Sequence, residues 1–297
     1  MRVFVTGATG WIGSATVPHL LTAGHDVVGL ARSARSAEVL RGLGAEPVRG
    51  ALADLDVLAR ESRAADAVLH LGFVHDFDDW AGASRTERRA VETMLDALEG
   101  TGRGFALAAG VAGLTPGRLA TEEDRTPQDG ADALRGGSES LALAAADRGV
   151  RAVSVRFAPT VHGEGDHGFV ASLVSAAREH GESVYVGDGA HRWAAVHVAD
   201  AGRLAARALL EAPAGSAWHA VAEEGVPTRR IAEAVGARLG LPVRSVSPDE
   251  ATEHLGWLAP IFGTDHTASS ARTQRLLAWQ PEGPTLLDDI AADAYVR

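Results

Sequence analysis

The chain has 297 residues, no cysteine and a net charge of −11. This length holds one large α/β domain or a domain with an appended lobe. The lack of cysteine excludes disulfides and thiolate ligands, and no metal site is expected. The acidic balance argues against nucleic acid as a partner. The chain begins MRVFVTGATG and shows neither a signal-peptide pattern nor a long uncharged apolar run. A cytoplasmic protein with no membrane partner is therefore expected.

The basic residues are all arginine, 28 in number, and lysine does not occur. A genome rich in G and C explains such a bias through its arginine codons. The chemical consequence is that no Schiff base, lysine base or lysine phosphate clamp can form. Tyrosine is also rare, with Tyr185 and Tyr295 as its two occurrences.

Apolar, β-branched runs alternate with stretches of helical period along the first half of the chain. Strands are predicted at 2–6, 26–31, 45–50, 66–73, 104–109 and 150–157. Helices are predicted at 11–23, 86–98 and 138–148. This alternation predicts an α/β fold, a Rossmann-type doubly wound parallel sheet covered on both faces.

The second half of the chain is less regular. One helix is predicted to end at about residue 180, and two more are predicted at 197–212 and 226–240. Strands are predicted at 183–189 and 218–222. We therefore expect residues 1–160 to form a dinucleotide-binding domain. Residues 161–297 would supply the remaining sheet elements, interleaved with a small C-terminal substrate-binding lobe.

The first strand is followed by the glycine-rich loop TGATGWIG, in which Gly7, Gly10 and Gly13 are spaced GxxGxxG. In such loops the first glycine permits a tight turn, the second lets the backbone approach a pyrophosphate, and the third lets the helix pack closely. The helix N-terminus adds a favourable field for negative charge. The alternative is a turn with a purely structural role.

Cofactor choice is usually read at the end of the second strand, which here continues as LARSARS with Arg32, Ser33 and Arg35. Arginine suits a 2′-phosphate, whereas an acidic residue would suit the ribose hydroxyls of NAD. The sequence thus favours NADP over NAD. The alternative is that both arginines are solvated surface charges.

Several motifs together resemble the extended short-chain dehydrogenase/reductases, the NAD-dependent epimerase/dehydratase-like group. They are TGATGWIG, LARS, VLHLGF, RFAPTVHG and AAVHVADAGR, spread over nearly the whole chain. The resemblance implies a bound NAD(P) and a substrate held between the sheet edge and the lobe. It also implies a set of cofactor contacts: Gly7, Thr9, Gly10, Trp11, Ile12, Arg32, Ser33, Leu52, Leu71, Gly72, Phe73, Phe157 and Pro159.

The same resemblance places catalytic Ser, Tyr and Lys at positions where this chain has Ala109, Arg135 and Glu139. This pattern is similar to that of the family's atypical members. Arg135 cannot exchange a proton at any useful pH, but it can place a ligand or stabilise an oxyanion. Removing it is therefore expected to leave the pH dependence of the rate unchanged. Glu139 is expected near the nicotinamide ribose, as an acceptor for its hydroxyls.

Histidines are the candidates for a proton donor in place of tyrosine. His75 follows the fourth strand and His162 follows the sixth, where the family binds cofactor and substrate, and histidine has a suitable pKa. His167, Arg192 and Trp193 are candidate substrate contacts. For each of these residues a structural or surface role is the alternative.

The preferred interpretation is an NADP-dependent oxidoreductase acting on a small or medium organic molecule with a proton donor other than tyrosine. Two alternatives stay open: a non-redox isomerase, cyclase or dehydratase of secondary metabolism, and an NADP-sensing binding protein. The family resemblance also implies a homodimer packed through helices near 86–99 and 136–148, and the alanine-rich segment SLALAAA suits close helix packing.

Overall fold

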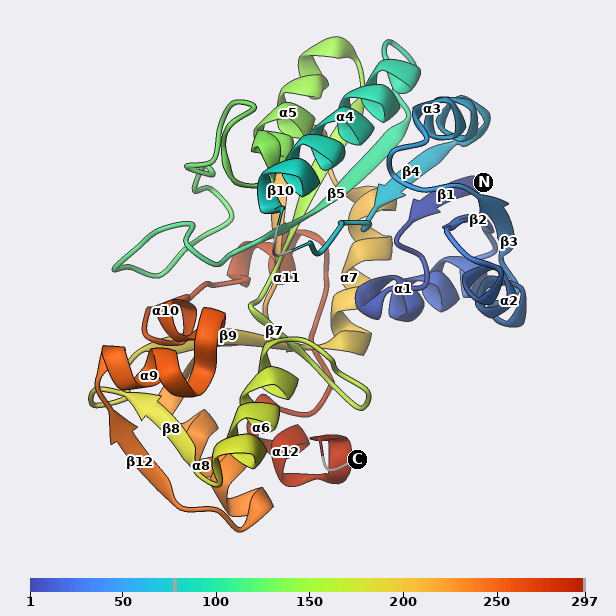
Figure 1. Ribbon diagram of the computed structural model, residues 1–297. Coiled ribbons are helices and arrows are strands. Elements are labelled where there is room, and N and C mark those ends of the chain that lie inside the picture. The colour runs from blue at the N-terminus through green and yellow to red at the C-terminus, as the bar shows by residue number, and fades with distance from the viewer. Residues whose placement is uncertain (77–78, 296–297) are drawn as a thin grey trace.

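The computed structural model describes residues 1–76 and 79–295, and Figure 1 shows a large sheet domain with a smaller lobe beneath it. Seven strands form the central sheet in the order β10–β6–β5–β4–β1–β2–β3, and all neighbours are parallel. Their bounds are Arg2–Thr6 (β1), Asp26–Ala31 (β2), Glu46–Arg49 (β3), Ala67–His70 (β4), Gly104–Gly110 (β5), Arg151–Phe157 (β6) and Ser216–Ala220 (β10). The expected doubly wound α/β sheet is confirmed.

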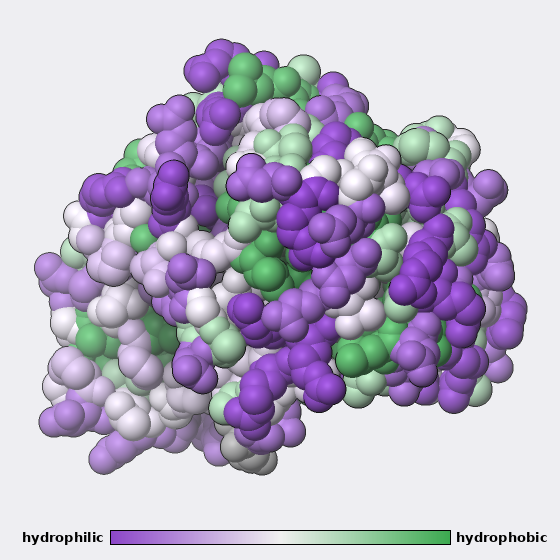
Figure 2. Space-filling view, turned by 90° about the horizontal axis from the view of Figure 1, so that it is seen from above, coloured by the Kyte–Doolittle hydropathy of each residue, from purple (hydrophilic) through white to green (hydrophobic). Residues whose placement is uncertain are grey.

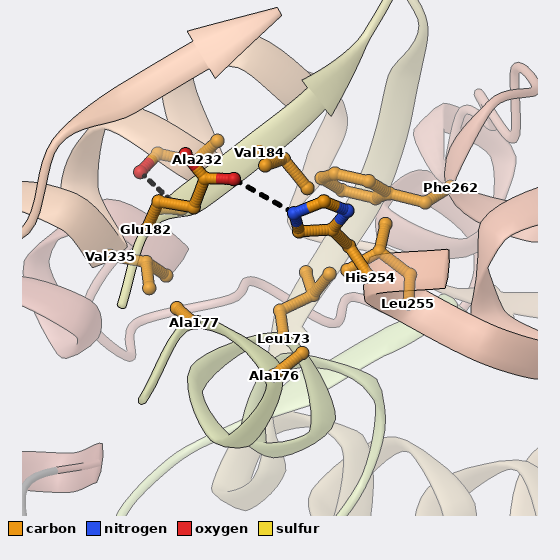
Figure 3. A pocket seen from close by; sticks show the side chains of 11 residues that line it. Leu173, Ala176, Ala177, Glu182, Val184, Ala232, Val235, His254, Leu255 and Phe262 are labelled. Atoms are coloured by element: carbon orange, nitrogen blue, oxygen red, sulfur yellow. Dashed lines mark hydrogen bonds and ion pairs between the residues drawn. The ribbon is translucent and has the colours of Figure 1, made fainter. Parts of the chain in front are cut away.

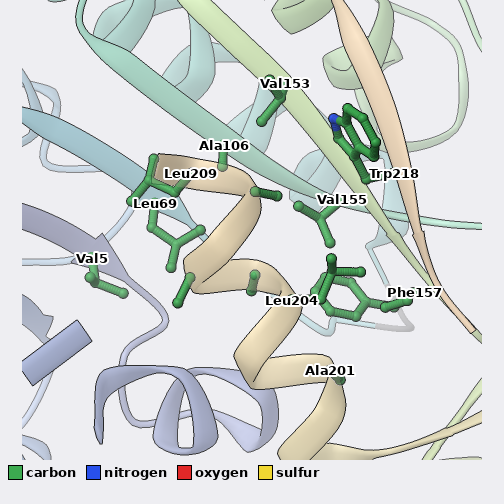
Figure 4. Close-up of a cluster of buried hydrophobic side chains, with 14 of the residues drawn as sticks. Val5, Leu69, Ala106, Val153, Val155, Phe157, Ala201, Leu204, Leu209 and Trp218 are labelled. Carbon is green, nitrogen blue, oxygen red and sulfur yellow. The ribbon is translucent and has the colours of Figure 1, made fainter. Parts of the chain in front are cut away.

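Helices cover both faces of this sheet (Figure 1). One face carries α1 (Trp11–Thr22), α2 (Ala34–Leu43) and α7 (Val198–Glu211), and the other carries α3 (Leu55–Ala64), α4 (Trp80–Leu98) and α5 (Ser138–Ala144). In Figure 4, Ala201, Leu204 and Leu209 of α7 point at side chains of the sheet, including Leu69, Val153 and Val155. Both faces of the strands are therefore buried, which explains their continuous apolar runs.

The strand order reverses next to β1. From β1 the chain moves outward to β2 and β3, then returns to the other side of β1 with β4. In such sheets ligands bind at the carboxyl edge beside the point where the strand order reverses, and we refer to this edge, at the ends of β1 and β4, as the crevice.

The lobe is built from later segments. A three-stranded sheet, β11 (Glu223–Pro227), β9 (Arg192–His197) and β7 (Thr160–His162), borders it, and β8 (Ser183–Val186) pairs with β12 (Val243–Val246). Its helices are α6 (Phe169–His180), α8 (Thr228–Leu239), α9 (Pro248–Leu255), α10 (Ala259–Phe262) and α12 (Leu286–Ala291), with α11 (Ala271–Leu276) nearer to β10. A separate apolar core fills the lobe.

The structure differs from the predicted elements at the ends of β4 and α4. The fourth strand stops at His70, not at residue 73, because the Leu71 N–H turns back to the Thr6 carbonyl and the Gly72 N–H to the Thr6 hydroxyl. Helix α4 begins at Trp80, six residues before the predicted start, because Asp79 caps it by accepting from the Gly82 N–H at 2.8 Å. Strands β11 and β12 were not predicted, since EEGVP and VRSV are short and the first contains Gly and Pro.

None of the helices in the described part of the chain is long and apolar enough to cross a membrane. Figure 2 looks down on the face that carries α3, α4 and α5, where hydrophilic residues surround small hydrophobic patches. The expected homodimer contact through α4 and α5 stays a prediction.

Helix α1, which carries the glycine loop, packs against α7 at Gly202, where a Cβ would lie 2.7 Å from the Ala15 carbonyl carbon. We expect Gly202→Ala to push the two helices apart and to destabilise the fold by about 1–3 kcal/mol, more than the gain in helix propensity offsets. The matched control is Gly42→Ala in α2, where a Cβ would meet nothing within 4 Å. Urea unfolding should show a loss for the first variant and no loss for the second; equal midpoints would contradict the packing argument.

Candidate functional site

The β1–α1 turn is in contact with the chain leaving β4. Gly7 has φ +69°, and a Cβ there would lie 2.6 Å from the Gly72 nitrogen. A Cβ on Gly13 would lie 2.1 Å from the Gly7 carbonyl oxygen. Both distances are below any real Cβ contact, so only glycine permits this packing, and the bare backbone faces the crevice.

The first turn of α1 has room for an anion. Gly10 is the N-cap residue, it offers no side-chain cap, and the turn contains no acidic residue. The N–H groups of this turn therefore point at the crevice with the positive end of the helix dipole behind them. These residues fit the pyrophosphate of a dinucleotide.

Trp11, in this turn, contacts residues outside the glycine loop. Trp11 donates its Nε1–H to the Val161 carbonyl at 2.7 Å, and its ring meets His167 edge-on at 5.9 Å. Thr9 and Ile12 are half-buried. Trp11 thus joins the glycine loop to the loop after β7, so the predicted substrate residue His167 lies beside the predicted cofactor loop.

At the end of β2, Arg32 and Arg35 are exposed and have no hydrogen bond or ion pair within the described part of the chain. Ser33 has a different role from the one expected: its hydroxyl caps α2 and exchanges hydrogen bonds with Ser36. Leu52 is buried against Gly72. The two arginines are therefore the groups at this end of the crevice that can take a phosphate.

Phe73, on the chain leaving β4, is a platform for several predicted residues. The Arg135 guanidinium carbon lies 4.8 Å from its ring centroid, and the His75 ring stands against it at 5.2 Å with an interplanar angle of 80°. Trp80 contacts it at 5.1 Å. The structure thus brings Arg135 and His75 together around one aromatic ring.

Arg135 donates three hydrogen bonds to two partners, Glu87 and the Ala108 carbonyl. It lies in a 3₁₀ turn (η1, Leu134–Gly137) with φ +53°, a conformation that is uncommon for a residue with a Cβ. Its Nε and Nη2 donate to the two carboxylate oxygens of Glu87, and its Nη1 donates to the Ala108 carbonyl at 2.9 Å. Arg135 therefore lies where β5 ends, next to Ala109.

Glu87 is a site residue that the sequence analysis missed. Its side chain is 1% exposed, and burial raises the pKa of its carboxyl, an effect opposed by the charge and hydrogen bonds of Arg135. A signal was present: helical spacing places it on the apolar face of α4 with Ala83, Ala90, Val91 and Met94. An acid on such a face requires a partner.

His75 has a pKa below its ordinary value. Partial loss of water is the largest cause, and the charges of Arg135, His167 and Arg32 lower the pKa of His75 further. If His75 carries the pH dependence of the rate, the charge of Arg135 bears on it, in contrast to the expectation that removing Arg135 leaves the profile unchanged. Removal of the guanidinium should raise the pKa of His75 and shift the profile.

A neutral histidine lies behind this platform. His70, the last residue of β4, is fully buried, its Nδ1 is 2.7 Å from the Thr6 hydroxyl, and its ring stacks on Phe105. Burial and the charge of Arg135 lower the pKa of His70 to about 3. It is therefore uncharged at neutral pH and orders the turn by fixing Thr6.

Two predicted residues lie away from the sheet edge. His162 is fully buried, with Nδ1 2.6 Å from Asp289 of α12, so the expected role as proton donor is wrong in this arrangement. Trp193 is also fully buried, packed on Phe169 and Phe262 inside the lobe, and does not face a substrate. The side chains that surround both residues include Asp289 and Phe262, which lie far along the chain and could not be paired with them from the sequence.

The remaining predicted residues lie partly in the lobe and partly at the carboxyl edge of the sheet. Arg192 is exposed, and its Nε donates to the Gly225 carbonyl at 3.2 Å, at the outer end of β9. Phe157 ends β6, pairs with Gly110 of β5 and is buried, and Pro159 is half-buried. Leu71 is half-buried at the exit of β4.

The cavities inside the lobe are separate from this crevice. One, about 10 Å³, lies between α6, β8 and α9 and holds one water at most; Figure 3 shows Glu182 bonded to His254 across its wall. An open groove of about 260 Å³ lies between residues 164–166, α6 and Tyr295. Neither is lined by the glycine turn or by Phe73.

Comparison with known proteins decides the family. The model of the NAD dependent epimerase/dehydratase family matches residues 3–220. The chain belongs to this family. A relative described as uncharacterized, from Schizosaccharomyces pombe, is 46% identical over 99% of this chain and 100% of its own length. A quinoline-oxide ketoreductase of Stigmatella aurantiaca is 29% identical over 60% of this chain and 55% of its own.

Among solved structures, the dTDP-glucose 4,6-dehydratase DesIV of Streptomyces venezuelae, which has NAD bound, superposes with a TM-score of 0.77. It is 23% identical, over 98% of this chain and 95% of the other, so it supports the family's fold alone. The cofactor of this epimerase/dehydratase family is a nicotinamide dinucleotide, and the glycine turn described above fits one.

Within this family frame, Glu139 departs from its expected position at the ribose. Its Oε1 accepts from the Ser154 hydroxyl at 2.7 Å and from the Arg156 Nε at 2.5 Å. Arg156 is 1% exposed and also donates to the Asp124 carbonyl at 2.8 Å. Glu139 therefore neutralises a buried arginine of β6, which sequence reasoning could not pair with it across 17 residues.

We expect Arg156→Met to destabilise the protein by about 3–5 kcal/mol, because it leaves the Glu139 carboxylate buried without its partner. Arg156→Met combined with Glu139→Leu should recover most of that loss. The exposed pair of Arg229 and Glu233 provides the control, since Arg229→Met should change the free energy of unfolding far less than Arg156→Met does. Chemical denaturation measures all three, and a small effect of Arg156→Met alone would contradict the assignment.

Proposed function

We propose that the protein is an NADP-dependent oxidoreductase that interconverts a carbonyl and an alcohol on a small or medium organic molecule, with His75 exchanging the proton. The observation that carries this proposal is the grouping of His75 and Arg135 around Phe73 beside the glycine turn. The ketoreductase named among the relatives supports a carbonyl reaction.

The preference for NADP is supported by Arg32 and Arg35. Both side chains are exposed at the end of β2 and have no partner within the described residues. A 2′-phosphate would offer each a charge-assisted hydrogen bond. No carboxylate follows β2 closely enough to bind the ribose of NAD, since the next acid along the chain is Glu38.

The chemistry of the site follows from two groups with different properties. A bound NADPH supplies hydride to the carbonyl carbon, and the oxygen must gain a proton. His75 can give that proton, since it titrates below neutrality and is exposed to the crevice. Arg135 stays charged throughout and stabilises negative charge that develops on the oxygen. Phe73 orients both groups through its ring.

A preference for NADPH over NADH is the first consequence. Changing Arg32 to Asp should remove it, a loss of about 1.5–3 kcal/mol for a charge-assisted contact. Isothermal calorimetry with both cofactors measures the difference. Arg230→Asp, at an exposed arginine of α8 in the lobe, is the control and should leave the preference unchanged. Equal affinities in the parent protein would overturn the NADP assignment.

Turnover should follow the protonation of His75. In carbonyl reduction the protonated form is needed, so the rate should fall as pH rises through its pKa, which lies below 6.5. Alcohol oxidation needs the neutral form, so that rate should fall as pH drops through the same value. His75→Ala should remove this limb, and Arg135→Ala should move it upward because a positive neighbour is lost.

The measurement is a pH–rate profile of NADPH consumption with a panel of aldehydes, ketones and enones. His162→Ala is the control, because the buried His162 does not reach the crevice. A limb that survives in His75→Ala would assign the proton to substrate or solvent. NADPH binding without consumption by any panel member would instead favour a non-redox reaction or a sensor.

A further inference from the structure

Arg135 retains hydrogen-bonding capacity toward the crevice. A guanidinium has five N–H groups. Glu87 and the Ala108 carbonyl take three of them, one from Nε, one from Nη1 and one from Nη2. One N–H on each terminal nitrogen is therefore used by no described residue, and the side chain is 29% exposed. The group is fixed in place and partly exposed, and it keeps two N–H groups for a further acceptor.

Several basic groups lie near these donors although the whole chain carries −11. The charged groups that act on the neighbouring His75 are Arg135, His167 and Arg32, all cationic when charged. The one buried carboxylate at this position, Glu87, is already occupied on both oxygens by Arg135. An anion at the crevice therefore finds hydrogen-bond donors together with basic groups.

We propose that Arg135 determines substrate specificity by binding a carboxylate, and that the substrate is an oxo acid. This inference rests on the proposed function, since it takes the oxo group to be the one that His75 serves. Both side chains contact the Phe73 ring, so a single small molecule can reach both. Glu87 is the positioning residue, because it holds the guanidinium in its place.

The donor geometry favours a carboxylate over a transient oxyanion alone. Two N–H groups on adjacent nitrogens match two oxygens of one carboxylate, and a guanidinium cannot lose its charge. The simpler role, in which Arg135 only neutralises Glu87, is energetically weak. A buried Arg–Glu pair costs desolvation of both ions, and apolar residues of similar volume are often as stable.

The test uses binding, so that it does not depend on turnover. Benzoylformate and its neutral isostere benzoylformamide are titrated calorimetrically into the full-length protein, with and without saturating NADP⁺. We expect the acid to bind at least tenfold more tightly than the amide. In Arg135→Gln the acid should bind as weakly as the amide, while affinity for NADP⁺ stays the same.

Two further variants separate ligand binding from folding. The double variant Glu87→Gln/Arg135→Gln keeps a neutral hydrogen-bonded pair; it should unfold like the parent yet lack the preference for the acid. Arg148→Gln removes another arginine that is paired with two acids, on the surface, and should leave the preference intact.

The proposal is overturned if acid and amide bind alike, if neither binds at millimolar concentration, or if Arg135→Gln keeps the preference. A loss of NADP⁺ affinity in Arg135→Gln, with the acid unaffected, would assign the donors to a cofactor phosphate instead. NADPH consumption with neutral carbonyls alone would sustain the oxidoreductase and reject the oxo acid. Tight binding of the acid without any NADPH consumption would sustain the carboxylate site at Arg135 and reject the oxidoreductase.

Discussion

No side chain fits between the β1–α1 turn and the chain that leaves β4. Gly7 and Gly13 allow backbone to touch backbone there, and Gly202 repeats the arrangement where α7 meets α1. This close packing fixes three things at once: the height of the first turn of α1, the point at which β4 must stop, and the direction of residues 71–75. Phe73, and with it Arg135 and His75, are placed by this constraint, so the site depends on backbone contact before any polar interaction.

Two arginine–glutamate pairs each have one member in the turn or helix that follows β5, and the two pairs have different roles. Arg156 is closed off from solvent and its partner Glu139 is nearly so, which makes that pair a structural element between β6 and α5. Arg135 is paired with the buried Glu87, but its own side chain remains partly exposed. Because burial raises the pKa of Glu87 while its partner opposes the shift, the carboxylate is costly, and its effect is to immobilise a guanidinium. An acidic protein thereby keeps a positive position at its ligand edge.

The fold could be predicted from the sequence because strand and helix periods are local signals. The glycines of the first turn are close to one another in sequence, as are the two arginines after β2, so each motif could be recognised. The candidate site was predicted only in part. His75 and Arg135 were identified, but the Glu87 partner lies 48 residues before Arg135, and the burial of His162 and Trp193 depends on residues such as Asp289 and Phe262 far along the chain. Pairings across such separations follow from packing, which no period in the sequence reports.

On the proposed mechanism, the placement of charge would allow a member of this family to work without lysine. A lysine near a tyrosine promotes proton loss from the phenol hydroxyl. In the same way, a fixed guanidinium near an imidazole lowers the pKa of the imidazolium and makes it a stronger acid. Arg135 acts in this sense on His75, and it does so from the position at which the family resemblance predicts tyrosine. The proton-exchanging group would then have moved from the helix after β5 to the chain after β4, while the positive charge stays at the sheet edge. Such an exchange keeps acid and electrostatic stabiliser within reach of one substrate, since both are anchored on the same phenylalanine ring.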